Sequence, residues 1–348
     1  MGISLDVPAQ LREEFRGLPG QHIVVRTQLD DEEQRRTYSL VSAPGESPLR
    51  IVVRVLSAGR MSRYLAEELN AGDHLDVLPP NGSFTPRRAG QAKGTYVAFA
   101  SGCGITPVLG VIRSLLAANS NNRVLLFYGN ASTARAMCLE ELLALKDRYV
   151  ERLSLHFLMS REPQEVELYN GRIDAERVRQ FARTLFAPAQ VTEYFVCGPG
   201  NMIEAVAATL RELGVSADHI HGEHFTLATT LANESTSEAV ADASPAAAPP
   251  GTAADQSEVA VLMDGRRRTF TMRMNDEVVL DAAARAGLEL PFSCRAGVCS
   301  TCRTKVVRGA VEMAQNYALE EWEVEQGYVL ACQSRVTTPV LELDYDEK

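Results

Sequence analysis

Four cysteines near the end of the chain have the spacing of an iron–sulfur site. Cys294, Cys299 and Cys302 form a C-x4-C-x2-C run, and Cys332 follows after 29 further residues. This spacing is typical of plant-type [2Fe–2S] ligation, in which one loop supplies three thiolates and a distant segment supplies the fourth. Structural zinc sites usually carry two C-x2-C pairs, and this chain has one. The pattern therefore predicts a [2Fe–2S] cluster and leaves zinc as the less favoured interpretation.

Two short segments far upstream suit a flavin nucleotide. In RRTYSL, Tyr38 can stack on an aromatic ring, Ser39 can form a hydrogen bond with that ring, and Arg36 can neutralise a phosphate. In GRMSRYL, Gly59 permits a tight turn, and Ser62 is expected to begin a helix whose N–H groups could hold a pyrophosphate. Each segment alone is a weak signal, because tyrosine in a strand usually packs and serine before a helix usually caps it. Together, at this spacing, they indicate a flavin site.

Two glycine-rich turns follow predicted buried strands. ASGCGITPVLG places Gly102 and Gly104 before a helix, where the backbone can approach an anionic phosphate. VCGPGNM is a second such turn, and its Cys197 lies at the carboxyl edge of the predicted sheet, where open α/β sheets bind ligands. Neither segment is the G-x-G-x-x-G fingerprint. The alternatives are an ordinary strand-to-helix turn and a cysteine that acts only as a small buried hydrophobe.

Composition and charge narrow the class of protein. The chain has 348 residues and a formal net charge of −10, which disfavours nucleic acid as a partner. It has no apolar stretch long enough for a membrane helix, so no membrane association is expected. The start of the sequence does not resemble a secretory signal, which predicts a cytoplasmic protein. Seven cysteines in such a chain favour metal or redox chemistry over disulfides.

The elements that must position these residues form three predicted domains. Residues 1–88 read as β-branched or alternating strands and predict a small antiparallel β-barrel. Residues 94–228 alternate buried strands with helices and predict a doubly wound parallel sheet. Residues 233–257 are rich in Ala, Pro and Ser and predict a flexible linker. Residues 258–348 begin with a hairpin around an Asp-Gly turn and carry the cysteines.

These motifs, in this order, resemble the ferredoxin–NADP reductase superfamily with a fused plant-type ferredoxin domain. The motifs are R-x-Y-S, G-x-x-S, G-x-G-I-T-P, C-G-P and the terminal cysteine run, and the resemblance covers essentially the whole chain. It implies a β-grasp fold for the last domain. Within the superfamily, GRMSRYLAEEL, SGCGITPVLGVI and GYVLACQ resemble the reductases of phenylacetyl-CoA epoxidases and of 3-ketosteroid 9α-hydroxylases.

The resemblance also implies roles for individual residues, with FAD, NAD(P)H and a [2Fe–2S] cluster as cofactors. Ser39 and Cys197 would lie where hydride passes. The implied FAD contacts are Arg36, Tyr38, Ser39, Gly59, Ser62 and Phe225. The implied NAD(P)H contacts are Gly102, Gly104, Ile105, Thr106, Pro107, Cys197, Gly198 and Pro199. The implied cluster ligands are Cys294, Cys299, Cys302 and Cys332.

Cofactor choice depends on the segment MSREPQEVELYNGR. It resembles the segment that binds the 2′-phosphate in NADP-dependent relatives, which would make Ser160 and Arg161 the contacts. Arginine offers charge-assisted hydrogen bonds to a phosphate, so we expect NADPH rather than NADH. A solvated arginine after a strand is the alternative.

The implied function is a reductase component that passes electrons from NAD(P)H through FAD and the cluster to a partner oxygenase. By resemblance, that partner is the di-iron epoxidase that acts on phenylacetyl-CoA. A reductase for a Rieske-type or steroid hydroxylase is the alternative of the same class. A redox-sensing or zinc-structured module is the alternative of another class. The family's barrel usually begins with a further strand before the first one seen here, so we also expect an unpaired strand edge.

Overall fold

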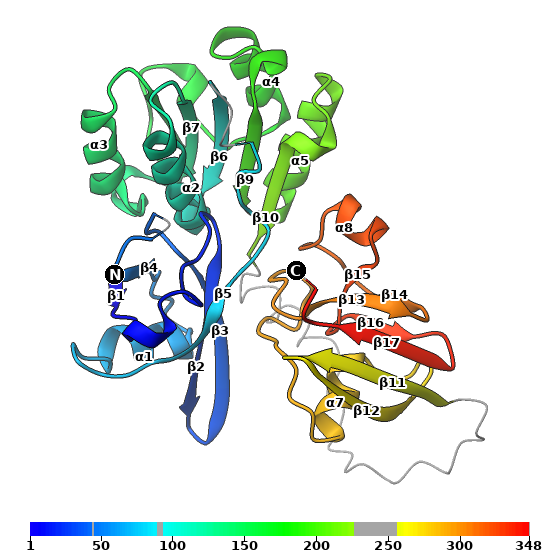
Figure 1. The fold of residues 1–348 in the computed structure, drawn as a ribbon. Helices are drawn as coiled ribbons and strands as arrows, with labels where there is room; N and C mark the ends of the chain where they lie inside the picture. The colour runs from blue at the N-terminus through cyan, green and yellow to red at the C-terminus, as the bar shows by residue number, and fades with distance from the viewer. Residues whose placement is uncertain (44, 89–92, 226–255, 348) are drawn as a thin grey trace. The chain divides into compact units, whose positions relative to one another are not determined.

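The computed structural model describes residues 1–43, 45–88, 93–225 and 256–347. Contacts divide the chain into two compact units, Met1–Phe225 and Thr226–Lys348 (Figure 1). The predicted linker lies outside the described residues except for 256 and 257, which begin the first strand of the second unit. Within the described ranges, no helix combines the length and the hydropathy that crossing a bilayer requires.

The first unit begins with the predicted antiparallel strands. The central hairpin turns at Asp30 and Asp31, whose φ angles of 52° and 62° are those of a two-residue type I′ turn. Strands pair in the orders β1-β4 and β3-β2-β5, and an isolated bridge between Leu40 and Ile51 links the two groups. The bounds are β1 Gly2–Leu5, η1 Ala9–Leu11, β2 His22–Leu29, β3 Glu32–Ser39, β4 Leu49–Val52, α1 Arg60–Glu67 and β5 Asp76–Asn81.

This barrel is open along one side. Among the described strands, β1 and β5 pair with only one neighbour each and not with each other. Both line a cavity of about 670 Å³ whose walls include Leu5, Phe15, Ile23 and Val77. The strand edge expected to be unpaired therefore lies beside this cavity.

The rest of the first unit is the predicted doubly wound parallel sheet, in the order β10-β9-β6-β7-β8. One hydrophobic cluster includes α2 and α3 residues and another includes α4 and α5 residues, so helices cover both faces (Figure 1). Strand order reverses between β6 and β9, which makes their carboxyl ends the expected ligand crevice. The bounds are β6 Thr95–Ser101, η2 Gly102–Gly104, α2 Ile105–Ala118, β7 Arg123–Asn130, η3 Thr133–Arg135, α3 Leu139–Arg148, β8 Leu153–Met159, η4 Glu167–Tyr169, α4 Ala175–Thr184, η5 Pro188–Gln190, β9 Glu193–Gly198, α5 Gly200–Glu212, η6 Ala217–His219 and β10 Ile220–His224.

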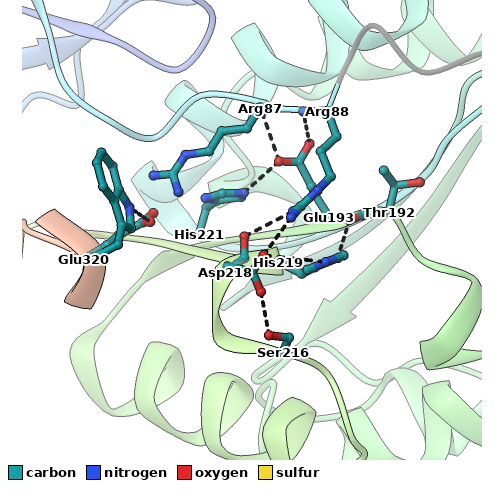
Figure 2. Close-up of polar contacts among 10 residues, drawn as sticks. Arg87, Arg88, Thr192, Glu193, Ser216, Asp218, His219, His221 and Glu320 are labelled. Atoms are coloured by element: carbon teal, nitrogen blue, oxygen red, sulfur yellow. Dashed lines mark hydrogen bonds and ion pairs between the residues drawn. The ribbon is translucent and has the colours of Figure 1, made fainter. Parts of the chain in front are cut away.

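A buried carboxylate fixes the connection between the barrel and the sheet (Figure 2). Glu193 accepts hydrogen bonds from the backbone N–H groups of Arg87 and Arg88, at 2.9 and 3.1 Å, and lies 2.9 Å from Nε2 of His221. Glu193 and His221 are fully buried. Burial alone would raise the pKa of Glu193, but these three contacts outweigh it and hold that pKa below its usual value. The connection is therefore anchored to β9 and β10, the strands beside the crevice.

The second unit is an α+β domain built on a five-stranded mixed sheet in the order β12-β11-β17-β13-β15. Its first hairpin turns at Asp264 and Gly265, whose φ angles of 54° and 67° fit the predicted Asp-Gly turn. Helix α7 packs Val279, Leu280, Ala282 and Ala283 into the core of this unit. The bounds are β11 Gln256–Met263, β12 Arg266–Arg273, α7 Val279–Arg285, β13 Arg303–Arg308, β14 Val311–Met313, α8 Glu321–Glu325, β15 Tyr328–Leu330, β16 Ser334–Val336 and β17 Val340–Asp344.

Candidate functional site

The two predicted glycine-rich turns meet at the point where the strand order reverses. A methyl group placed on Gly104 would lie 2.1 Å from the carbonyl oxygen of Cys197 and 3.0 Å from the backbone nitrogen of Gly198. No side chain fits in that space. Gly104 therefore lets the β6–α2 turn lie directly against the end of β9.

A cavity of about 320 Å³ opens beside these turns. Of the predicted nucleotide contacts, Gly102, Ser160 and Pro199 line it. Three cations that the sequence analysis did not single out also line it, namely Arg54, Arg135 and Arg172, and no carboxylate is among its described lining residues. A cavity with this charge suits a ligand that carries several phosphates.

The other predicted nucleotide contacts lie away from the cavity wall. Ile105, Thr106 and Pro107 are buried in the first turn of α2, and the Thr106 hydroxyl donates to the carbonyl of Cys103 at 3.0 Å. Arg161 is exposed and is not among the described lining residues. The hydrophobic periodicity of the sequence could not show that the first turn of α2 is buried, because the burial of a helix depends on which of its faces packs against the sheet.

The predicted flavin contacts on β3 point to opposite sides of the strand. Arg36 and Tyr38 share one face, and Ser39 lies on the other, because successive side chains alternate in a strand. Burial raises the pKa of Tyr38 to about 12, against a smaller opposite effect of Arg36, so the phenol keeps its proton. Arg36 is exposed and donates from Nη1 to the carbonyl of Arg35 at 2.7 Å.

Ser62 does not begin the helix, so that prediction is wrong. Helix α1 begins at Arg60, with Gly59 as its N-cap in an extended conformation. The Ser62 hydroxyl instead accepts from the N–H of Leu56 and donates to the carbonyl of Gly59, both at 3.1 Å. Ser62 thus shapes the turn before the helix, and the N–H groups of the first helical turn remain the ones that could hold a pyrophosphate.

A row of four polar side chains runs from the barrel to the parallel sheet. Ser39 and His22 are register partners in the β3–β2 pair, and Cys197 and Glu223 are register partners in the β9–β10 pair. His22 joins the two pairs, since its Nδ1 lies 3.6 Å from Oε1 of Glu223. Ser39 and Cys197, the two ends of this row, were predicted from their motifs, whereas His22 and Glu223 were not, because strand registers and the barrel–sheet contact are tertiary features.

Several polar atoms of this row are buried and lack hydrogen-bond partners within the described residues. They are the Ser39 hydroxyl, both ring nitrogens of His22 and Oε2 of Glu223. Native proteins rarely leave such groups unpaired, so the row fits an aromatic group whose edge carries both donors and acceptors, such as the flavin ring. Phe225 directly follows β10 and packs partly against the core on the α2 face of the sheet.

Burial also sets the protonation of the groups at the sheet end of the row. It raises the pKa of Glu223, and His22 offsets only part of that rise. It raises the pKa of the fully buried Cys197 thiol well above the usual range, and nearby Glu223 adds to the effect. Cys197 is therefore a neutral thiol, a form that does not act as a nucleophile.

Ser39→Ala offers a direct test of this row. We expect the unfolding free energy of the cofactor-free protein to change little, because the lost hydroxyl has no partner there. FAD affinity should fall by about 3- to 10-fold, the usual value of one hydrogen bond. Denaturant unfolding of the cofactor-free protein and fluorescence titration with FAD measure the two effects. A destabilised cofactor-free protein with unchanged FAD affinity would contradict the assignment.

The four cysteines lie near one another, and two thiol hydrogen bonds join them as two pairs. Cys294 interacts with Cys299, and Cys302 interacts with Cys332, in each case through a thiol hydrogen bond. In the part of the chain that the structure describes, no three His, Cys, Asp or Glu side chains converge as a single metal ion would require. Two pairs of thiols match the ligand set of a centre with two metal atoms.

The loop that carries Cys294, Cys299 and Cys302 directs a backbone N–H group toward a cysteine sulfur. Arg295, Gly297 and Ser300 have φ angles of 53°, 72° and 49°, so the chain coils tightly between the cysteines. The N–H of Ala296 donates to Sγ of Cys294 at 3.4 Å. Such N–H groups stabilise negative charge on sulfur.

Two thiols in the cluster region lose their protons readily. The hydrogen bond with Cys299, helped by the N–H groups of Ala296 and Val298, lowers the pKa of Cys294 to about 6. The hydrogen bond with Cys302 lowers the pKa of Cys332 to about 7. Thiolates are the form that binds metal, so each pair supplies one ready ligand near neutral pH.

Comparisons with protein-family models match all three parts of the chain. Residues 3–85 match the oxidoreductase FAD-binding domain, and residues 99–208 match the oxidoreductase NAD-binding domain. Residues 261–337 match the 2Fe-2S iron-sulfur cluster binding domain. FAD, NAD(P)H and a [2Fe–2S] cluster are therefore the cofactors that the three sites take.

Two curated relatives align over nearly the whole chain. The chain is 36% identical to one of the subunits of the 1,2-phenylacetyl-CoA epoxidase of Escherichia coli strain K12 over 348 residues, which cover 99% of this chain and 93% of that protein. It is 32% identical to the ferredoxin reductase component of the 3-ketosteroid-9-alpha-monooxygenase of Rhodococcus rhodochrous over 343 residues, which cover 97% of this chain and 91% of that protein.

Solved structures share the fold. Phthalate dioxygenase reductase aligns with a TM-score of 0.53 at 21% identity and covers 98% of this chain and 89% of its own. An intact type IV self-sufficient cytochrome P450 monooxygenase aligns with a TM-score of 0.65 at 22% identity and covers 98% of this chain and 37% of its own. The three-part architecture is thus shared well beyond the close relatives.

Proposed function

Since the chain belongs to the family of electron-transfer reductases of multicomponent oxygenases that combine FAD-binding, NAD-binding and 2Fe-2S domains, we propose that it serves a phenylacetyl-CoA epoxidase. The observation that carries this assignment is the 36% identity to a component of that enzyme over nearly all of both chains. The family assignment leaves no place for the zinc-structured, non-enzymatic alternative.

The order of the sites matches the electron route of such a reductase. A nicotinamide gives up two electrons at once, and a [2Fe–2S] cluster accepts one at a time, so a flavin that can do both lies between them. Residues of the first unit would position the donor and the acceptor of the first electron transfer, from the nicotinamide to the flavin. The cavity beside Gly102 and Pro199 would hold the nucleotide, and the Ser39–Cys197 row would hold and orient the flavin edge.

We also propose NADPH as the electron donor. Arg54, Arg135 and Arg172 give the cavity three positive charges, and two of these suffice for a pyrophosphate. Arg135 ends η3, which follows β7 after two residues, and we assign the third phosphate to it. Of the two contacts predicted from the sequence, Ser160 lines the cavity and could bind the 2′-phosphate, whereas Arg161 is not among the described lining residues and would not.

Arg135→Ala is expected to raise KM for NADPH about tenfold, the value of one charge-assisted hydrogen bond, while KM for NADH changes little. Arg161→Ala is the matched control and should leave both constants nearly unchanged. Steady-state reduction of ferricyanide with each nucleotide gives the four constants. If Arg161→Ala raises KM for NADPH and Arg135→Ala does not, Arg161 is the phosphate contact, as expected from the sequence, and the assignment to Arg135 is wrong.

Reconstitution with purified oxygenases tests the partner. We expect tight coupling of NADPH oxidation to product formation with the phenylacetyl-CoA epoxidase components. A steroid hydroxylase oxygenase is the second candidate, favoured by the 32% identity to its reductase. Efficient turnover with that enzyme alone, or with a Rieske-type oxygenase alone, would overturn the epoxidase assignment and leave the electron route intact.

We place the protein in the cytoplasm as part of the same proposal. All seven cysteines lie in the described ranges and are free of disulfides. Thiols of this kind persist in a reducing compartment.

A further inference from the structure

Two segments that leave neighbouring strands both line the nucleotide cavity. Ala131 and Arg135 belong to the segment after β7, and Ser160, Gly171 and Arg172 belong to the segment after β8. Since β7 and β8 pair in parallel, the two segments leave the sheet at the same carboxyl edge. The position of one segment relative to the other therefore sets where the charges of Arg135 and Arg172 lie.

Two backbone hydrogen bonds continue the β7–β8 pairing beyond the ends of the strands. The N–H of Ser160 donates to the carbonyl of Asn130, and the N–H of Arg161 donates to the carbonyl of Ala131, both at 2.9 Å. These bonds bring the next residue, Glu162, to the beginning of η3.

The Glu162 carboxylate binds the first residue of η3 through both of its oxygens. Oε2 accepts from the backbone N–H of Thr133 at 2.8 Å, and Oε1 accepts from the Thr133 hydroxyl at 2.6 Å. The bond from the hydroxyl, and then the bond from the N–H, lower the pKa of Glu162, so the group is an anion near neutral pH. Hydrogen bonds to a charged acceptor are stronger than neutral ones, so this contact can hold a short exposed turn.

Burial does little to hold η3 in place. Its three residues, Thr133, Ala134 and Arg135, are all exposed. The N–H of Arg135 donates to the carbonyl of Ser132 at 3.0 Å, a bond that is local to the turn. The turn therefore depends on its contact with Glu162 for its position beside the segment after β8.

The segment after β8 does not depend on Glu162 in the same way. The Asn170 side chain accepts from the N–H of Gln164 at 2.8 Å and donates to the carbonyl of Gln164 at 2.9 Å. The N–H of Gly171 donates to the carbonyl of Met159 at 2.7 Å, which closes the segment at its base. Loss of the Glu162 carboxylate should therefore release η3 and leave the other segment in place.

We propose, on the basis of the NADPH assignment above, that Glu162 positions Arg135 for the third phosphate of the nucleotide. By holding Thr133, the carboxylate fixes η3 and keeps the Arg135 guanidinium at the cavity. Glu162 does not need to touch the nucleotide for this role. Its negative charge alone would repel a phosphate, so a positioning role and a purely electrostatic role predict opposite effects on NADPH binding.

Glu162→Ala tests this inference in the full-length protein with its cofactors. We expect KM for NADPH to rise about three- to tenfold, the usual value of one or two hydrogen bonds. KM for NADH, and kcat with either nucleotide, should change little, because NADH lacks the third phosphate. Steady-state reduction of ferricyanide gives these constants without any oxygenase.

Glu165→Ala is the matched control, because it removes the same charge from an exposed position of the same segment. It should not raise KM for NADPH. Thr133→Val removes the hydroxyl bond of the proposed contact and keeps the backbone bond, so it should raise KM for NADPH by less than Glu162→Ala does. If Glu162→Ala does not fold, Thr133→Val decides, and an unchanged KM for NADPH in that variant overturns the proposal.

A double variant separates the role of Glu162 from the role of Arg135. If Glu162 acts through Arg135, the double variant should have the same KM for NADPH as Arg135→Ala alone. A KM for NADPH that rises in Arg135→Ala but falls or stays unchanged in Glu162→Ala overturns the positioning role and leaves the NADPH assignment standing. Equal rises for NADPH and NADH in Glu162→Ala overturn the positioning role as well. An unchanged KM for NADPH in Arg135→Ala overturns both.

Discussion

A Cys332→Ala variant is expected to lose NADPH-dependent reduction of cytochrome c while keeping NADPH-dependent reduction of ferricyanide. Cys332 is the one predicted ligand outside the 294–302 loop, and it completes the second cysteine pair. Removing it would leave Cys302 without its partner and the cluster with three of its four predicted protein ligands. The first unit, which holds the flavin and nucleotide sites, is compact by itself and does not depend on this cysteine.

The expected loss of cytochrome c reduction exceeds about a hundredfold, because even residues one shell beyond a metal ligand typically contribute 10- to 100-fold. Ferricyanide can take electrons at the flavin, so its reduction should stay within about twofold of the parent rate, since no flavin contact is changed. Iron content and the visible spectrum measured on the same sample show whether the cluster has gone.

Cys138→Ser is the matched control for this experiment. Cys138 lies in the first unit, just before α3, and belongs to neither cysteine pair. Both activities should survive there. Undiminished cytochrome c reduction by an iron-free Cys332→Ala protein would show that electrons leave without the cluster, and the proposed route would be wrong.

Gly104→Ala should have the second largest effect, on both stability and nucleotide binding. The added methyl group would lie 2.1 Å from the carbonyl oxygen and 2.5 Å from the carbonyl carbon of Cys197. These are backbone atoms at the end of β9, held between β6 and β10, so they cannot move aside as the end of a flexible side chain could. The two turns must separate, and the unfolding free energy of the first unit should fall by about 1–3 kcal/mol, as overpacking usually costs.

The same separation would move Gly102 and Pro199, which belong to the two turns and line the cavity. KM for NADPH should therefore rise by at least about tenfold, since small misplacements at an active site cost that much or more. Thermal unfolding and steady-state kinetics with ferricyanide measure the two effects together.

Gly200→Ala is the control at the same edge of the sheet. Gly200 begins α5, and the nearest atom to an added methyl group is Nδ1 of His224 at 3.9 Å. Its stability and kinetics should match those of the parent protein. If Gly104→Ala and Gly200→Ala have the same stability and the same KM for NADPH, close contact between the two glycine-rich turns is not required for folding or for nucleotide binding.

The sequence predicted the fold well because its strongest signals are local. Buried parallel strands are continuous apolar runs, and the two type I′ turns described above carry acidic residues or glycine. Cysteine spacing likewise predicted the cluster domain. These features depend on neighbours along the chain, so no tertiary information was needed.

Features that depend on partners from other strands could not be predicted in the same way. Nothing in the local sequence shows that His22 would lie 3.6 Å from Glu223, two hundred residues away. The same holds for Arg54, which comes from the barrel side and lines the nucleotide cavity. The start of α1 was misplaced by two residues because the serine that resembles a helix cap bonds to the preceding turn instead.

The β2–β3 hairpin makes the site sensitive to the length of the chain at the hairpin tip. Its two-residue turn fixes the pairing of His22 with Ser39, the two residues at the open end of the ribbon. One residue inserted or deleted at Asp30–Asp31 would shift every pair along the hairpin and turn one of these side chains to the opposite surface. Homologues should therefore conserve the two-residue length of this exposed tip and place there residues that tolerate a positive φ, such as Asp, Asn and Gly.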